Sequence, residues 1–372
     1  MAGIGVGVGR LSDPDPSDDD LPTLQLSSHG GSGVNSLDIP LDSQRLSALG
    51  GGRWQTRQLP TSTHSMVALT WTRGSQVPNI RFRSRIGGKW QGWQTLSPLQ
   101  DLPDLDAEER TAVAGSDLVW IGAANGIQVD VSGERPEGLT LVLLHPAQEL
   151  ELARVAPRTS SRGEEQTQER APRPELRGRR DWGAERSWRS GEPTYNDSIR
   201  QVHVHHTVNS NTYSRQDVPG LIRGMYRYHT HNLGWSDIGY NFLVDRFGRI
   251  WVGRAGGARR PVRGAHTLGF NSTSCGVSVI GNFETTKPTY RVLNSVAALA
   301  AWKLDRYGRN PRGHIRVTSE GSDNYRAGHR VRLPVIDGHR DTNDTACPGR
   351  YLFEALPRIR RRAKRIVDAY PA

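Results

Sequence analysis

The stretch Arg200-Gln201-Val202-His203-Val204-His205-His206-Thr207 decides the fold of the C-terminal half of the chain. Val202 and Val204 alternate with polar residues, which is the period of a β-strand with one apolar face. The stretch then runs into the polar loop Asn209-Ser210-Asn211. His205 and His206 therefore lie where a predicted strand ends, and the ends of strands are where α/β folds assemble their sites.

The residues that follow this strand alternate between helical and strand patterns. Apolar residues recur at helical spacing over 217–232 and 292–307, and each stretch is followed by a glycine, Gly234 or Gly308, which is a typical end signal. A last helix is predicted over about 350–368. Further strands are predicted over 240–245, 250–253 and 275–280. We therefore predict an α/β domain over 176–368, with a mixed central sheet flanked by helices.

The preceding part of the chain predicts a different fold class. Short strand-like stretches, with Gly87-Gly88 as a hairpin turn, occur at 66–71, 80–86, 118–122, 126–131 and 139–144, the third and fourth forming a pair. Their spacing predicts a small all-β, sandwich-like domain over 61–147. Residues 1–60 are rich in Gly, Ser, Asp and Pro, which predicts a disordered or loosely attached lead-in. Residues 148–175 lack an apolar period and predict a linker.

The basic charge of the chain allows an anionic partner, although charge in a linker or tail more often serves only to keep the chain solvated. The 372 residues carry a net charge of +11, and a basic surface attracts nucleic acid or an anionic wall polymer. The Arg clusters lie in the linker and the C-terminal tail, without interleaved aromatic residues or a nucleic-acid motif, so we expect no nucleic acid partner. No apolar run approaches the roughly 18 residues of a transmembrane helix. We expect a monomer.

Three residues could hold a metal ion. His339 and Cys347 lie in a polar loop over 337–349 that Gly and Pro interrupt, and such a loop can direct both side chains at one point, together with His205 or His206. Imidazole and thiolate suit zinc, and three protein ligands leave a fourth position for water, as catalytic zinc sites do. The residues alone leave alternatives open: a strand-end histidine bonded to the backbone, a Cys347–Cys275 disulfide, or His339 as a loop cap.

Residues from about 176 to 366 resemble the peptidoglycan recognition proteins and the related N-acetylmuramoyl-L-alanine amidases. Six segments follow the order of that family: Arg180-Asp181-Trp182-Gly183-Ala184, Val204-His205-His206-Thr207, 234–242 (GWSDIGYNF), 264–271 (GAHTLGFN), 276–283 (GVSVIGNF) and 338–349. The β-rich segment before them resembles the N-terminal module that accompanies such amidases in actinobacteria.

The resemblance implies Zn²⁺ as cofactor, with His205 rather than His206 as the first ligand and His339 and Cys347 as the others. Family members that only bind peptidoglycan typically lack the cysteine, so Cys347 favours catalysis. The family tyrosine corresponds to Tyr240, whose phenol can donate to a developing oxyanion or simply pack in the groove. Thr345, two residues before the cysteine, is expected to orient water or substrate.

The same resemblance implies substrate contacts from His206, His266 and Asn271. The function it implies is zinc-dependent hydrolysis of the amide between N-acetylmuramic acid and L-alanine in peptidoglycan, with a non-catalytic peptidoglycan-binding protein as the alternative. The general base stays unassigned, because Ser278 stands where some related amidases carry Glu. We expect a secreted or wall-associated protein. Met1–Gly9 are small and apolar without a preceding basic region, so a signal peptide would require a start site further upstream.

Overall fold

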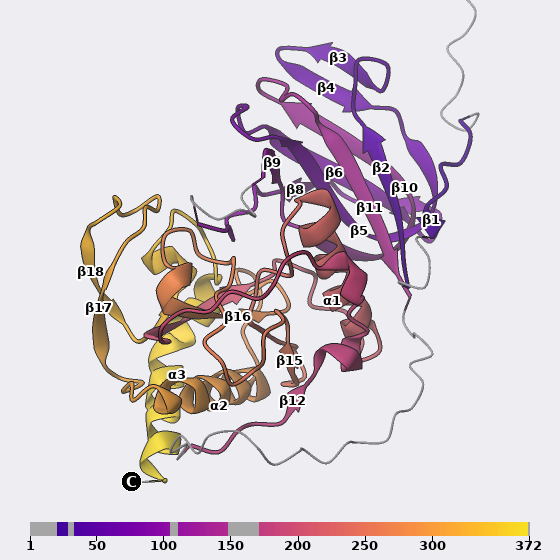
Figure 1. Cartoon of the computed structure of the whole chain (residues 1–372). Coiled ribbons are helices and arrows are strands. Elements are labelled where there is room, and N and C mark those ends of the chain that lie inside the picture. Colours follow the sequence, from indigo (N-terminus) through magenta and orange to yellow (C-terminus); the bar gives the residue numbers. More distant parts are fainter. Residues whose placement is uncertain (1–20, 29–32, 105–110, 148–170, 371–372) are drawn as a thin grey trace, which may run out of the picture.

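The computed structural model describes residues 21–28, 33–104, 111–147 and 171–370 (Figure 1). Within the described residues, the regular elements of the N-terminal module are all strands. They are β1 (Ser27–Ser28), β2 (Val34–Pro40), β3 (Leu46–Gly50), β4 (Arg53–Thr56), β5 (Leu59–Thr72), β6 (Asn79–Ile86), β7 (Lys89–Trp90), β8 (Gln94–Leu96), β9 (Val113–Gly115), β10 (Val119–Ser132) and β11 (Thr140–Pro146). The main path runs β1-β2-β11-β5-β10-β4-β3, and it branches where β6 pairs with β10 and β9 with β5.

Two neighbouring strands at the centre of the module, β5 and β11, carry buried side chains on both faces. In β5, Val67 and Leu69 point into the core of the module, whereas Met66 and Ala68 belong to a second cluster that contains helix residues of the C-terminal domain. β11 divides in the same way, with Leu141 and Leu143 inside the module. Alternate side chains of a strand point to opposite faces. The continuous apolar run 66–69 therefore serves two cores at once.

Two predictions for the module are wrong. The lead-in predicted over 1–60 contains β1 to β4, and residues 1–20 lie outside the described part of the chain. In β2 the buried residues Val34, Ser36 and Ile39 do not all lie on one face, so the strand shows no regular alternation of apolar and polar residues. The pair predicted at 118–122 and 126–131 is the single strand β10, which absorbs Gly122 (φ 80°) and two register shifts as irregularities.

The linker predicted over 148–175 falls largely on residues outside the described ranges. Its final part is described, and there Ala171 is buried and its backbone N–H donates to Asp305 Oδ2 at 2.8 Å. This end of the segment is therefore attached to the C-terminal domain.

The C-terminal domain has the mixed sheet and flanking helices predicted for it. The strand order is β12-β15-β14-β16-β13-β19, antiparallel only between β14 and β15. The bounds are β12 (Leu176–Arg177), β13 (Gln201–His206), β14 (Phe242–Val244), β15 (Ile250–Val252), β16 (Ser274–Val279) and β19 (Ile336–Gly338). A separate hairpin, β17 (His314–Thr318) and β18 (Arg330–Pro334), was not predicted.

Helices cover both faces of this sheet. The helices α2 (Tyr290–Arg306) and α3 (Arg350–Asp368) pack together with the apolar face of β13, which includes Val202 and Val204. The helix α1 (Asp217–Arg227) shares the second cluster with sheet residues and with β5 and β11 of the module. In Figure 1, α1 accordingly lies between the purple strands of the module and the C-terminal sheet.

Two glycines let α1 approach the module closely. A Cβ at Gly224 would overlap Met66 Sδ of β5, and a Cβ at Gly220 would come within 3.2 Å of the Ala147 backbone oxygen.

Hydrogen bonds reinforce the contact between the C-terminal domain and the module: the Tyr228 hydroxyl donates to the Ser116 backbone oxygen at 2.8 Å, and Arg223 donates to the Ala147 oxygen. The module and the C-terminal domain therefore share one packed interface.

Candidate metal site and substrate groove

Strand register places the first two predicted ligands side by side. β13 and β19 are parallel, with Val204 opposite Gly338. The residue after Val204 is His205, and the residue after Gly338 is His339. Parallel strands end at the same edge of a sheet, so the two imidazoles meet there with ring centroids 4.7 Å apart. Both side chains are completely buried.

The loop after β19 places Cys347, the third predicted ligand, beside His205. A short helical turn, His339–Asp341, starts the loop, and the Arg340 backbone N–H donates to the Cys347 carbonyl at 3.0 Å and closes it. The Cys347 Sγ lies 3.7 Å from His205 Nδ1 and accepts a hydrogen bond from the His206 backbone N–H at 3.4 Å. Neither cysteine forms a disulfide, and Cys275 is a buried strand residue. The disulfide alternative is thereby excluded for the structure described.

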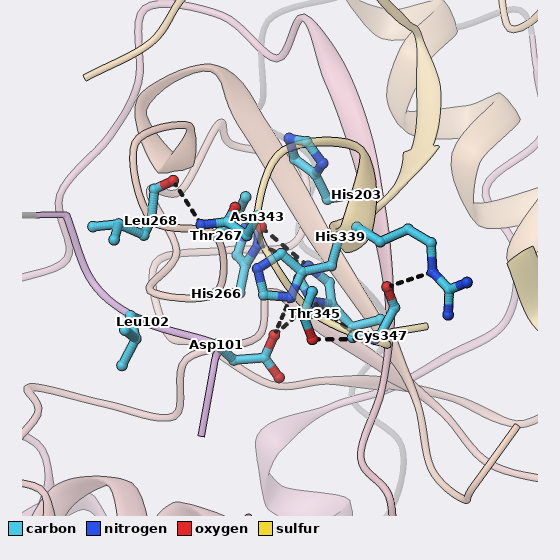
Figure 2. A network of polar contacts seen from close by, with 12 residues as sticks. Asp101, Leu102, His203, His266, Thr267, Leu268, His339, Asn343, Thr345 and Cys347 are labelled. Atoms are coloured by element: carbon cyan, nitrogen blue, oxygen red, sulfur yellow. Dashed lines mark hydrogen bonds and ion pairs between the residues drawn. The ribbon is translucent and has the colours of Figure 1, made fainter. Parts of the chain in front are cut away.

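A fourth donor comes from the N-terminal module. Asp101, in the segment after β8, places its Oδ1 2.7 Å from His205 Nδ1 and 3.0 Å from His339 Nδ1. Its Oδ2 accepts a hydrogen bond from the Tyr240 hydroxyl at 2.6 Å. Figure 2 shows the Asp101 carboxylate on the ribbon of the module, pointing at His339 and Cys347. The donor atoms of Asp101, His205, His339 and Cys347 all lie within 4.8 Å of one another.

This donor set fits a zinc ion. Zinc takes four ligands in a tetrahedron with bonds of about 2.0–2.3 Å, and histidine, thiolate and carboxylate are its usual ligands. The burial of His339 agrees with this fit: the side chain is completely buried, and its Nδ1 faces the Asp101 carboxylate at 3.0 Å. An imidazole and a carboxylate buried together are a combination that a metal ion stabilises when both bind it.

The electrostatics of the site match its burial. Burial lowers the pKa of His205 to about 4, although the Asp101 carboxylate opposes this shift. Burial and the Asp101 charge raise the pKa of the Cys347 thiol well above its usual value. Burial alone would raise the pKa of Asp101, but His205 and His339 hold it well below its ordinary value. Neutral imidazoles are ready ligands, and a bound cation would reverse the shift of the thiol.

Tyr240 and Thr345 both lie beside the donor set. Burial and the Asp101 charge raise the pKa of Tyr240 well above its usual value, so the phenol keeps its proton. The Thr345 hydroxyl accepts a hydrogen bond from the Cys347 backbone N–H at 3.1 Å and lines a cavity of about 400 Å³ with Asp101, His206 and Cys347. Both hydroxyls therefore lie close to the donor set, and their roles in the reaction stay a prediction.

The predicted substrate contacts divide into three cases. His206 borders the same cavity, and its Nδ1 accepts from the Phe283 backbone N–H at 3.2 Å. Asn271 is buried and its amide donates to the module, to the Leu102 oxygen at 3.1 Å and Asp104 Oδ1 at 3.0 Å. His266 is completely buried, with Nδ1 3.1 Å from His205 Nε2. His266 packs against the predicted ligand His205. In this arrangement it supports the His205 ring and does not face a substrate.

Sequence reasoning missed Asp101 and Asp104 because it treated the module as separate from the site. One signal was available: 101–109 (DLPDLDAEE) is an acidic stretch in a chain of net charge +11. Its reach to His205 spans 104 positions of sequence, which no local pattern reveals.

Comparison with known families agrees with this geometry. Residues 195–350 match the N-acetylmuramoyl-L-alanine amidase family, and residues 32–174 match the Rv3811 N-terminal galactose-binding domain-like family. The peptidoglycan recognition protein of Trichoplusia ni is 31% identical over 160 residues, which are 43% of this chain and 74% of that protein. This chain belongs to the peptidoglycan recognition protein and N-acetylmuramoyl-L-alanine amidase family.

Other relatives match the same share of the chain. Peptidoglycan-recognition protein LE of Drosophila melanogaster is 35% identical over 158 residues, 42% of this chain and 39% of that protein, so the chain spans about two fifths of that relative. Peptidoglycan recognition protein 1 of Mus musculus is 30% identical over 182 residues, 48% of this chain and 84% of that protein.

Among solved structures, Drosophila PGRP-LB is 28% identical, with a TM-score of 0.39 over 49% of this chain and 92% of that one. The N-acetylmuramoyl-L-alanine amidase LysCS from Clostridium intestinale is 22% identical, with a TM-score of 0.36 over 50% of this chain and 96% of that one. Among the residues that the structure describes, no helix combines the length and apolar character needed to cross a bilayer.

Proposed function

We propose that this protein is a zinc-dependent N-acetylmuramoyl-L-alanine amidase that cleaves the amide between N-acetylmuramic acid and L-alanine in peptidoglycan. The observation that carries the proposal is the convergence of His205, His339 and Cys347 at one edge of the sheet, beside the Tyr240 hydroxyl. Family membership supports the substrate class. Peptidoglycan lies outside the cytoplasmic membrane, so this function requires export.

Each side chain of the site has a distinct task in this proposal. His205, His339 and Cys347 hold the zinc, which when bound polarises a carbonyl group and activates water. Tyr240 remains a hydrogen-bond donor, and its hydroxyl, which donates to Asp101 in the structure, would donate to the oxygen on which negative charge develops when the substrate is bound. Thr345 fixes the Cys347 backbone and offers its own proton to the substrate or to water.

Cys347 is the residue that favours turnover over simple recognition. Two imidazoles and a thiolate form a three-ligand set of the kind that leaves one position open to water or substrate. The alternative function is peptidoglycan binding without hydrolysis, and the names of several relatives refer to recognition of peptidoglycan. The two functions share the groove, and they differ in the need for the metal.

The test compares the wild-type protein with Cys347→Ala. Metal content is measured by atomic absorption, and cleavage is measured as new L-alanine amino termini released from purified muropeptides, with and without a chelator. We expect one zinc per chain and chelator-sensitive release in the wild type, and loss of both in Cys347→Ala. Thr345→Ala is a matched neighbouring control that should retain the metal.

A specific result would favour the non-catalytic alternative. A zinc-loaded protein that binds muropeptides but releases no amine recognises peptidoglycan without cutting it. Retention of both zinc and activity by Cys347→Ala would overturn the ligand assignment.

A further inference from the structure

The segment that carries Asp101 is anchored firmly to the module before it enters the site. The Leu99 backbone N–H donates to the Gly115 oxygen at 2.9 Å, and the Asp117 N–H donates to the Ser97 oxygen at 2.8 Å. These bonds join the start of the segment to the strand β9 and its continuation. The four residues Asp101-Leu102-Pro103-Asp104 then extend into the C-terminal domain, and we name them the strap.

Asp101 contacts the metal-binding centre with both carboxylate oxygens. One oxygen lies near the Nδ1 atoms of His205 and His339, and the other accepts the Tyr240 hydroxyl. The carboxylate is therefore close to two predicted ligands and to the predicted oxyanion donor at once. Its side chain is only 8% exposed, so solvent has little access to this point.

The other end of the strap is held as firmly. Asp104 Oδ1 accepts hydrogen bonds from the Gly269 backbone N–H at 2.8 Å and from Asn271 Nδ2 at 3.0 Å. Its Oδ2 pairs with Arg263 at 2.7 Å. Asn271 also donates to the Leu102 carbonyl at 3.1 Å. The domain thus binds the strap as it would bind an extended peptide with two carboxylates, and one of the residues that does so is a predicted substrate contact.

The strap borders open space at each end. Asp104 and Arg263 line a cavity of about 590 Å³, and Asp101 lines the cavity of about 400 Å³ beside Cys347. Between the two cavities the strap covers the metal-binding residues. A ligand that extended from one cavity to the other would have to displace it.

We propose that Asp101 is a fourth zinc ligand, a carboxylate supplied by the N-terminal module, and that the strap closes the site until the module moves. The inference rests on the proposed function in one respect: its consequence is an amidase that stays inactive while the strap is in place. Four protein ligands are typical of closed structural zinc sites, and three with an open position are typical of catalytic ones. When Asp101 leaves the zinc, the closed site with four protein ligands becomes an open site with three.

The first experiment tests the ligand itself and does not depend on activity. Zinc is replaced by Co²⁺, whose visible absorption reports its ligands, and azide is added as an exogenous ligand. We expect azide to change the spectrum of Asp101→Ala and to leave that of the wild type unchanged. Asp38→Ala is the control, because it loses a contact with Asn232 across the same interface but touches no site residue. An identical azide response of wild type and Asp101→Ala would overturn the proposal.

The second experiment measures latency on muropeptides. If the open form is about a tenth of the population, opening the site raises activity about tenfold, so we expect Asp101→Ala and Asp101→Asn to exceed the wild type by at least that factor. Asp101→Asn keeps the shape of the side chain and guards against misfolding of the alanine variant. Loss of activity in both variants, with zinc retained, would make Asp101 a catalytic residue and overturn the inhibitory role.

The two experiments separate this inference from the proposed function. Spectra that differ as expected, with no cleavage by any variant, would retain the fourth ligand and reject the amidase. Equal activity and equal spectra in wild type and Asp101→Ala would retain the amidase and reject the strap.

Discussion

Strands β5 of the module and β13 of the C-terminal domain are both buried on two faces, but they use that burial differently. In β5 both faces of the run 66–69 are apolar. In β13, Val202 and Val204 fill one face, while His203 and His205 occupy the other with no exposure. A buried polar group costs free energy unless it has a partner. The comparison teaches that the histidine face of β13 needs polar partners, which a binding site supplies, whereas the two apolar faces of β5 join two cores.

The largest expected effect is a loss of zinc affinity when a histidine of β13 is replaced. His205→Ala should lower zinc affinity by at least about 100-fold, more than the loss typical of residues that only orient a ligand. His206→Ala should retain zinc, because the His206 ring bonds to the Phe283 backbone. Metal titration followed by equilibrium dialysis compares the two. Equal metal loss in both variants would contradict the choice between these neighbours.

The next largest effect comes from replacing one buried side chain on each face of β5. Met66→Ala and Leu69→Ala should each lower the free energy of unfolding by about 2–5 kcal/mol, since both side chains are completely buried. Only Met66 contacts α1, so only Met66→Ala should also increase muropeptide cleavage by loosening the interface. Urea unfolding and the amidase assay measure the two effects. A rise in activity in Leu69→Ala as well would show that general destabilisation opens the site.

A smaller effect concerns a histidine that is buried without a metal-binding role. Burial lowers the pKa of His64 in β5 to about 4, so the unfolded chain binds more protons than the folded one below the unfolded value of about 6.5. Stability from this group is complete above pH 6.5 and is lost as the pH falls towards 4. Between pH 7 and pH 5 the loss is about 2 kcal/mol.

The matched variant is His64→Gln, which has no titrating ring at this position. Urea unfolding at the two pH values should show a smaller loss for His64→Gln than for the wild type. The same pH dependence in both proteins would assign the loss to other groups.

The smallest effect lies on the face of the C-terminal sheet that is remote from the module. Thr289 Oγ1 accepts the Val292 backbone N–H at the start of α2, and replacing such a cap with Ala costs about 1 kcal/mol. Thr289→Ala should therefore lower the melting temperature slightly and leave the azide response of the Co²⁺ protein unchanged. A changed azide response would show that stability alone controls the strap.

Much of the C-terminal domain was predictable because its signals are local. The helix expected over 350–368 is α3 with the same bounds, and the strand at 275–280 is β16 within one residue. The hairpin of β17 and β18 was missed although its strands alternate polar and apolar residues, because each strand is short and contains only two apolar residues at alternate positions. In the module, strands β2 to β4 were missed because they contain few apolar residues: β3 and β4 bury one residue each, and the buried residues of β2 include Ser36.

The sequence by itself determined the fold class of both parts, the family, and the three residues that converge at the edge of the sheet. These follow from periodicity and from motifs whose residues are near one another in the chain. The tertiary structure alone decided that Asp101 lies between His205 and His339 and that Met66 packs on Gly224. Contacts of this kind depend on how two separately folded surfaces fit together, and neither surface carries the pattern of the other in its own sequence.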